Sequence, residues 1–231
     1  MPIPLQQAYL LHRRPYRETS LLLEVFTRGE GRKGLVARGA RRGKSPQSGI
    51  LQAFQALLLA WSGRGELGTL TQLETHGQQT RLTGKSLLSG FYLNELLIRL
   101  LHRHGPHPEL FDAYHQALSE LHQGQPAEPV LRVFETRLLS ALGYGLNLTH
   151  CIDTDAPLDP GVRYHFQHDC GAWLSPPAGV NTIPVSGATL LALDEGTISE
   201  AEQLHEAKHL LRQVLGHYLG DKPLQSRRLF R

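Results

Sequence analysis

The sequence predicts an α+β protein in which a small five-stranded β-barrel is followed by an α-helical domain. In residues 1–80, short apolar and β-forming runs alternate with glycine-rich turns, which is typical of a small barrel or sandwich. From residue 85 onward the apolar residues recur at helical spacing instead. We place the boundary near residue 80, within the polar segment HGQQTRLTGK, which gives domains 1–80 and 81–231.

Five segments of the first domain are predicted as strands. They cover residues 7–13, 20–27, 32–39, 51–62 and 67–75. The turns RGEG and GRGE follow the second and fourth segments, and their glycines permit the tight reversals that short strands need. A five-stranded barrel of about 75 residues has the size of an OB-fold, so an OB-like barrel is expected.

Helices are predicted in the second domain over residues 85–103, 109–122, 129–143 and 199–219. The third helix carries an apolar stripe of Leu131, Phe134, Leu138 and Leu142. Ser199 and Glu202 have the spacing of a capping box, which would open the last helix. Residues 150–178, rich in Asp, Pro and His, are predicted to be an irregular insert.

The charge is distributed unevenly along the chain. Residues 1–80 contain 11 Lys and Arg against 5 Asp and Glu, a net charge of +6, whereas residues 81–231 have a net charge of −3. Within residues 28–44, seven cations face a single acidic residue, Glu30. A basic domain joined to a mildly acidic one predicts a module that binds a polyanion.

Contact with a phosphate backbone requires clustered cations but little precise geometry, so the basic residues of the first domain are the candidate DNA contacts. They are Arg13, Arg14, Arg17, Arg32, Lys33, Arg38, Arg41, Arg42, Lys44 and Arg64. Aromatic residues are few here. Phe26 and Phe54 lie in apolar runs and are expected in the core, while Tyr16 is the aromatic residue best placed to touch a base. This balance favours electrostatic binding that tolerates many sequences.

The segment GARRGKS, residues 39–45, resembles a phosphate-binding P-loop and raises an enzymatic alternative. A Walker A loop needs four residues between its glycines, but only three separate Gly39 from Gly43, and Pro46 disfavours the helix that should follow. No nucleophile elbow or paired-carboxylate motif is present. We therefore expect no catalytic residue and no cofactor. A nucleotide-dependent or metal-dependent DNA-processing enzyme stays the alternative.

Cysteine content and hydropathy bear on the compartment. The two cysteines, Cys151 and Cys170, cannot form the disulfide framework of a small secreted protein. The first residues lack the pattern of a signal peptide, and no run approaches the roughly 18 apolar residues of a membrane span. A cytoplasmic protein without a membrane partner is expected.

Several separated motifs carry a family resemblance. The segments LLHRRPYRETSLLLEVFTRGEGRKGLVARGARRGKS, SGRGELGTL, GFYLNELLIRLL, ALGYGLNLTHC and KPLQSRRLF together resemble the RecO family of bacterial DNA repair proteins over nearly the whole chain. The resemblance implies a recombination mediator of the RecF pathway with an N-terminal OB-fold and a helical C-terminal domain. It implies binding of single- and double-stranded DNA, annealing of complementary strands, contact with the single-stranded-DNA-binding protein SSB, and cooperation with RecR in loading RecA. A location near the bacterial nucleoid follows.

The resemblance also bears on metal binding. Many members of the family hold zinc with two CxxC pairs, but the corresponding positions here are Cys151 with Thr154, then Ser175 with Ala178. We expect no zinc site, and expect Trp173 and Leu174 to replace the metal by packing. His165 and His168 lie in the same region and could form a metal site with Cys170, but we favour the expectation that no metal is bound.

A partner site is expected on the third helix. The tail of SSB is acidic and ends in an aromatic residue, so its receptor needs cations around an apolar pocket. Arg132 and Arg137, which flank the apolar stripe of this helix, are the candidates for this contact.

Overall fold

The computed structural model describes residues 4–42, 49–63, 65–77, 80–103 and 105–230. The chain divides into two compact units. The first unit comprises residues 1–125 and 224–231, and the second comprises residues 126–223.

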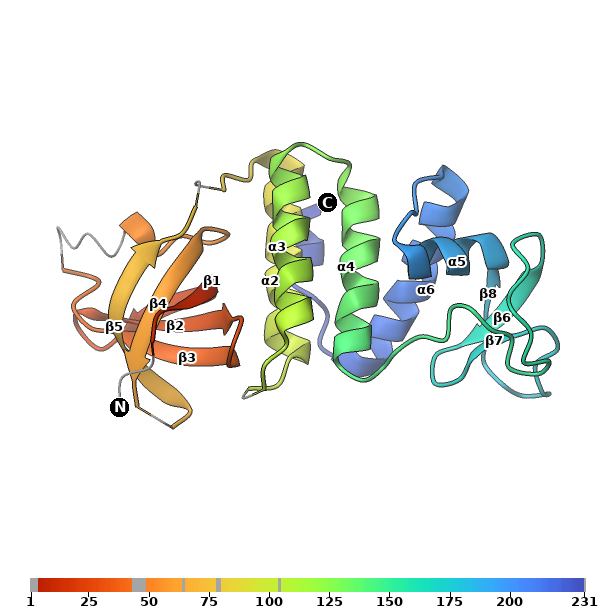
Figure 1. Ribbon diagram of the computed structural model, residues 1–231, viewed down its shortest axis with the longest axis horizontal. Coiled ribbons are helices and arrows are strands. Elements are labelled where there is room, and N and C mark those ends of the chain that lie inside the picture. The colour runs from red at the N-terminus through yellow and green to blue at the C-terminus, as the bar shows by residue number, and fades with distance from the viewer. Residues whose placement is uncertain (1–3, 43–48, 64, 78–79, 104, 231) are drawn as a thin grey trace. The chain divides into compact units, whose positions relative to one another are not determined.

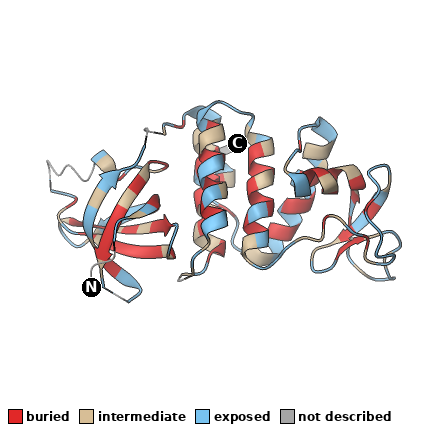
Figure 2. Ribbon diagram, viewed as in Figure 1, coloured by how far each residue is buried: buried red, intermediate tan, exposed pale blue. Residues whose placement is uncertain are grey.

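The first unit contains a closed five-stranded barrel, which confirms the predicted fold class (Figure 1). Its strands are β1 (Gln6–Tyr16), β2 (Ser20–Thr27), β3 (Gly31–Ala37), β4 (Ala56–Ser62) and β5 (Leu67–Thr75). They run in the order β1-β2-β3-β5-β4, with β3 and β5 parallel and the other neighbours antiparallel. Figure 2 shows buried residues along these strands, and the core includes Leu23, Leu35 and Trp61.

The fourth strand is shorter than the sequence predicts. It begins at Ala56 rather than at residue 51, because Phe54 takes a left-handed backbone conformation with φ of 67°. A bulky residue rarely adopts that conformation, and it breaks the extended backbone that a strand requires. The side chains of Phe54 and Phe26 are buried, as expected of core residues.

Helices α2 (Gly84–Leu100) and α3 (Pro108–His122) pack against the barrel within the same unit. Tyr9 of β1 lies edge-on to Tyr114 of α3, with ring centroids 5.1 Å apart, and its hydroxyl lies 2.5 Å from Nδ1 of His115. Burial raises the pKa of Tyr9 to about 12. Aromatic residues of the barrel wall are therefore used to hold a helix, which makes them poor candidates for base stacking.

The end of the chain returns to the first unit as a short 3-10 helix, η1 (Ser226–Phe230). The carboxylate of Glu95, on α2, accepts hydrogen bonds from the backbone amides of Gln225 and Ser226, each at 2.8 Å. The sequence motif KPLQSRRLF thus corresponds to a segment anchored on α2.

The second unit combines three helices with a small sheet. The helices are α4 (Ala127–Ala141), α5 (Gly187–Glu195) and α6 (Ala201–Leu219), and the strands are β6 (Arg163–Gln167), β7 (Gly171–Trp173) and β8 (Ile183–Ser186). The sheet has the order β7-β6-β8 and is antiparallel throughout. The described part of the chain contains no helix that is both long and apolar enough to cross a membrane.

The insert and the capping box of this unit were both predicted wrongly. The insert 150–178 is not wholly irregular, since β6 and β7 lie within it. Polar and aromatic residues alternate in RYHFQ, a pattern that predicts a strand, and its Tyr164 and Phe166 are buried. The capping box at Ser199 does not form. Helix α6 begins at Ala201 after Glu200, without a side-chain hydrogen bond to cap it.

Asp153 joins the two segments where relatives would carry zinc ligands. Its carboxylate accepts from the thiol of Cys151 at 2.8 Å and from the amides of Leu174 and Ser175 at 3.0 and 2.9 Å. These hydrogen bonds lower the pKa of Asp153 to about 2, and the bond from the thiol has the largest effect. The expectation that Leu174 replaces the metal by packing is wrong, since that side chain is 46% exposed. A carboxylate makes the connection instead.

Candidate nucleic-acid interface

One hollow on the barrel unites two of the basic groups that the sequence keeps apart. It has a volume of about 430 Å³ and is lined by Arg13, Arg14, Pro15, Leu21, Ala40, Arg41 and Arg42. We call it the arginine groove. Among the described residues that line it there is no carboxylate, and four of them are arginines.

The register of the barrel brings these arginines together. Strands β1 and β2 form a hairpin in which Arg14 pairs with Leu22, so the arginines of β1 lie at the hairpin end. The loop after β3 folds back on that hairpin, because the amide of Arg41 donates to the carbonyl of Thr19 at 2.9 Å. Gly39, with φ of 70°, permits the reversal.

Side-chain bonds fix part of the groove and leave part open. Arg13 donates to the carbonyl of Leu51 at 2.7 Å, and Arg41 donates to the carbonyl of Arg17 at 3.3 Å. Arg14 and Arg42 are exposed, and within the described ranges neither has an ion-pair partner. These two are the arginines best placed to meet an external anion.

Two further candidates, Arg17 and Arg38, lie beside the groove without lining it. Both are exposed, and each lies in a turn that flanks it. The guanidinium of Arg17 lies over the ring of Tyr16, 5.3 Å from its centroid. Tyr16 is partly exposed, whereas Tyr9, Phe26, Phe54 and Trp61, the other aromatic residues of the first 80, are buried. The surface therefore favours charge over stacking.

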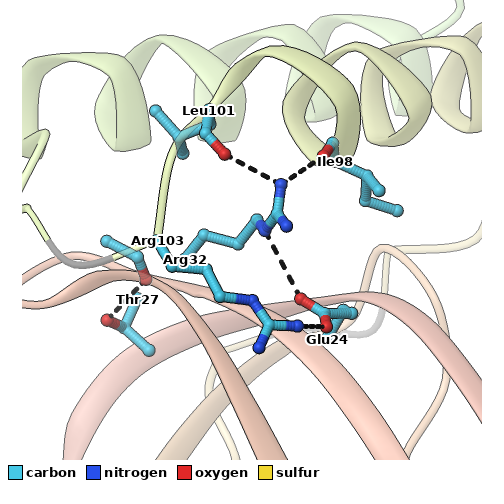
Figure 3. Close-up of polar contacts among 7 residues, drawn as sticks. Glu24, Thr27, Arg32, Ile98, Leu101 and Arg103 are labelled. Atoms are coloured by element: carbon cyan, nitrogen blue, oxygen red, sulfur yellow. Dashed lines mark hydrogen bonds and ion pairs between the residues drawn. The ribbon is translucent and has the colours of Figure 1, made fainter. Parts of the chain in front are cut away.

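Arg32, predicted to contact DNA, has an internal role in the structure. As Figure 3 shows, it donates to the carbonyls of Ile98 and Leu101 at the C-terminal end of helix α2. Its Nε lies 3.4 Å from Oε2 of Glu24, and the other carboxylate oxygen of Glu24 accepts from Arg103 (Figure 3). A cation at a helix C-terminus satisfies the last carbonyls and favours the helix dipole, so Arg32 joins barrel and helix.

Lys33 is also turned inward. Lys33 is only 3% exposed, and its ammonium group donates to the carbonyl of Gly65 at 2.9 Å. The signal was available in the sequence, because Lys33 shares the inward face of β3 with Leu35 and Ala37 at alternating positions. Lys44 and Arg64, the remaining candidates, lie outside the described residues.

The two arginines expected to meet the SSB tail differ in their surroundings. Arg132 is buried, and its Nη2 lies 2.8 Å from Oε1 of Glu135, a residue with no exposed surface. Arg137 is exposed on the same helix. Only the charge of Arg137 is therefore offered at the surface.

The segment GARRGKS contributes to the groove as a loop. The amide of Arg42 donates to the carbonyl of Gly39 at 3.0 Å, which closes a turn. Gly43, Lys44 and Ser45 lie outside the described residues. In chemical terms, the described lining offers cations for an anion and no nucleophile or general base.

Comparison with known proteins gives a family match for both parts of the chain. Residues 1–79 match the family described as Recombination protein O N terminal, and residues 81–228 match Recombination protein O C terminal. The chain is 48% identical to the DNA repair protein RecO of Azoarcus sp. (strain BH72), over 97% of this chain and 93% of that protein. It is 47% identical to that of Methylococcus capsulatus, over 98% and 93%. For Aliivibrio fischeri (strain ES114) the identity is 43%, over 98% and 94%.

Proposed function

We propose, since the chain belongs to the RecO family of DNA repair and recombination proteins, that it binds single- and double-stranded DNA and anneals complementary strands without ATP. The observation that carries this proposal is the arginine groove, in which Arg14 and Arg42 are exposed with no described ion-pair partner. Its contacts would be made to phosphates, which are present in every sequence.

Charge explains why such a surface suits annealing. Two complementary strands repel each other through their phosphates until base pairing begins. Cations that neutralise phosphates lower this repulsion and release condensed counterions, which drives binding without a chemical step. No energy source is required, and the groove supplies the charge from strand β1 and from the loop after β3, which is hydrogen-bonded to the β1–β2 turn.

Partners follow from the family and belong to the same proposal. We propose that the chain acts with RecR to help load RecA on SSB-coated DNA, and that Arg137 on helix α4 contributes to binding the acidic SSB tail. The exposure of Arg137 supports this assignment. Arg132 would support the site indirectly, by holding Glu135 inside the unit.

The enzymatic alternative has less support. The loop at Gly39 is one residue short of a Walker A motif, and the amide of Arg42 closes a turn on the carbonyl of Gly39. We therefore assign this loop to the phosphates of a DNA backbone rather than to those of ATP.

Strand annealing on SSB-coated complementary DNA tests the function, with and without ATP. A variant carrying Arg14→Ala and Arg42→Ala is compared with wild type. The matched control carries Arg81→Ala and Arg212→Ala, which removes the same charge from exposed arginines outside the groove.

The wild-type protein should anneal the strands equally well with and without ATP. The groove variant should anneal at least about tenfold more slowly at moderate salt, since it lacks two of the cations that neutralise phosphates. The control should behave like wild type. Annealing that required ATP, or that the groove variant performed normally, would overturn the proposal.

A further inference from the structure

Three potential metal ligands meet in the second unit, and neither cysteine is among them. They are His168 and Asp169, in the turn after β6, and His217, near the end of α6. One ligand atom from each lies within 4.8 Å of the others. The ligands of a tetrahedral ion with bonds of about 2.1 Å are roughly 3.4 Å apart, so small side-chain rotations would bring the three into range.

The contact between His168 and Asp169 is unusual. Nε2 of His168 lies 2.9 Å from Oδ2 of Asp169. This nitrogen is buried, yet the geometry is not that of a hydrogen bond to the carboxylate. The carboxylate oxygen thus lies off the direction in which the ring nitrogen would donate or accept. In the tautomer with Nε2 of His168 unprotonated, the two atoms are acceptors held side by side, which is the arrangement of ligands that converge on a third atom.

Both histidines face the same cavity. It has a volume of about 310 Å³ and is lined by Phe166, His168, Asn181, Thr182, Ile183, Gln213, Val214 and His217. Asn181 and Gln213, which also line it, are polar residues that can hydrogen-bond a water bound to an ion. The cavity would leave space for a fourth ligand beside the three protein atoms.

Aromatic packing positions His217 before any ion binds. Its ring lies 4.2 Å from the ring of His168 and nearly perpendicular to the ring of Tyr218, 5.2 Å away. Tyr218 is in turn stacked on Tyr144, with centroids 3.8 Å apart. A ligand held by its neighbours loses less conformational freedom when it binds a metal.

We propose that His168, Asp169 and His217 bind a divalent transition metal of the Zn²⁺ class. Two imidazoles and one carboxylate suit Zn²⁺, Co²⁺ or Ni²⁺, whereas Mg²⁺ and Ca²⁺ prefer oxygen ligands alone. The ion would tie the β6–β7 turn to the end of helix α6. The site differs in every ligand from the four-cysteine site of relatives, and it departs from the expectation of no metal.

The test uses full-length protein without an affinity tag, stripped of metal by chelator and dialysed. Zn²⁺ binding is measured by competition with a chromophoric chelator, and Co²⁺ binding by visible absorption. The variants are His217→Gln and His168→Gln. His205→Gln is the control, because it removes an exposed histidine from the same helix.

Wild type and His205→Gln should bind about one ion per chain, and Co²⁺ should give the strong absorption of a tetrahedral or five-coordinate site. Each ligand variant should bind at least about tenfold more weakly and lose that absorption. Added Zn²⁺ should raise the Tm of wild type but not of His217→Gln. Absence of binding, or equal binding by His217→Gln and His205→Gln, would overturn the proposal.

Discussion

The guanidinium of Arg41 donates to the backbone carbonyl of Arg17 across 3.3 Å, which links the loop after β3 to the turn between β1 and β2. These residues are 24 positions apart in the sequence, and the carbonyl of Glu18 accepts from the same nitrogen at 3.5 Å. The arginine groove is therefore a property of the barrel's register rather than of one basic segment.

Gly31 should tolerate no side chain. Its φ is 68°, and a Cβ would lie 2.0 Å from the carbonyl oxygen of Gly105. Gly77 has a similar φ of 66° with no neighbour within 4 Å, so Gly77→Ala isolates the backbone strain. We expect Gly31→Ala to lower the free energy of unfolding by at least about 2 kcal/mol more than Gly77→Ala does. Urea titration measures both, and equal losses would show that the backbone around Gly105 can move freely.

Arg132 should be required for stability rather than for surface contact. Arg132→Ala leaves Glu135 buried and without the ionic partner that Arg132 supplies, which we expect to cost about 3–5 kcal/mol. Arg137→Ala, on the exposed side of the same helix, should change stability by less than about 0.5 kcal/mol. Denaturant unfolding of both variants checks this. A stable Arg132→Ala protein would mean that Glu135 finds another partner or a proton.

Arg137 should contribute to binding an acidic tail. Arg137→Glu reverses an exposed charge, so we expect the isolated SSB tail peptide to bind about fivefold more weakly while affinity for naked DNA is retained. Fluorescence anisotropy with labelled peptide and labelled DNA measures both. Arg212→Glu, an exposed charge reversal on α6, is the control. Normal peptide binding by Arg137→Glu would place the tail elsewhere.

The carboxylate of Asp153 should make stability depend on pH. Its donors lower its pKa to about 2 in the folded chain, below the roughly 3.9 of an unfolded chain. This contribution is therefore complete above about pH 4 and is lost as the pH falls through the folded pKa near 2. Asp153→Asn should be less stable than wild type at neutral pH, and the difference should shrink over that window. A pH-independent difference in Tm would contradict the assignment.

Local patterns explain how much of the fold was predictable. The glycine-rich turns and the change from strand-like to helical spacing identified the barrel and four helices, because both patterns depend on neighbouring residues. Strand β4 was predicted too long, since the left-handed conformation of Phe54 leaves no mark on hydropathy. The sheet of β6, β7 and β8 was missed because its strands are short and polar residues surround them.

The candidate site was predictable in composition but not in geometry. Charge alone cannot separate Arg14, which is exposed, from Arg32, whose charge is used on the carbonyls of α2. Likewise, the sequence shows Glu135 one helical turn after Arg132, but only the packing of the unit shows that the two side chains are buried as a pair. The closeness of cations in the sequence predicted a basic surface, but tertiary contacts decide which of these cations are exposed on it.

The dependence of DNA affinity on salt tests the central claim most directly. The affinity for duplex and for single-stranded DNA is measured over a range of salt concentrations. Three proteins are compared: wild type, the Arg14→Ala and Arg42→Ala variant, and the Arg81→Ala and Arg212→Ala control. If each groove arginine neutralises one phosphate, removing both should make the log–log slope shallower by about 1.8 for duplex and about 1.4 for single strands, whatever the sequence. The control should keep the wild-type slope. An unchanged slope in the groove variant, or the same change in the control, would contradict the assignment of the arginine groove to DNA.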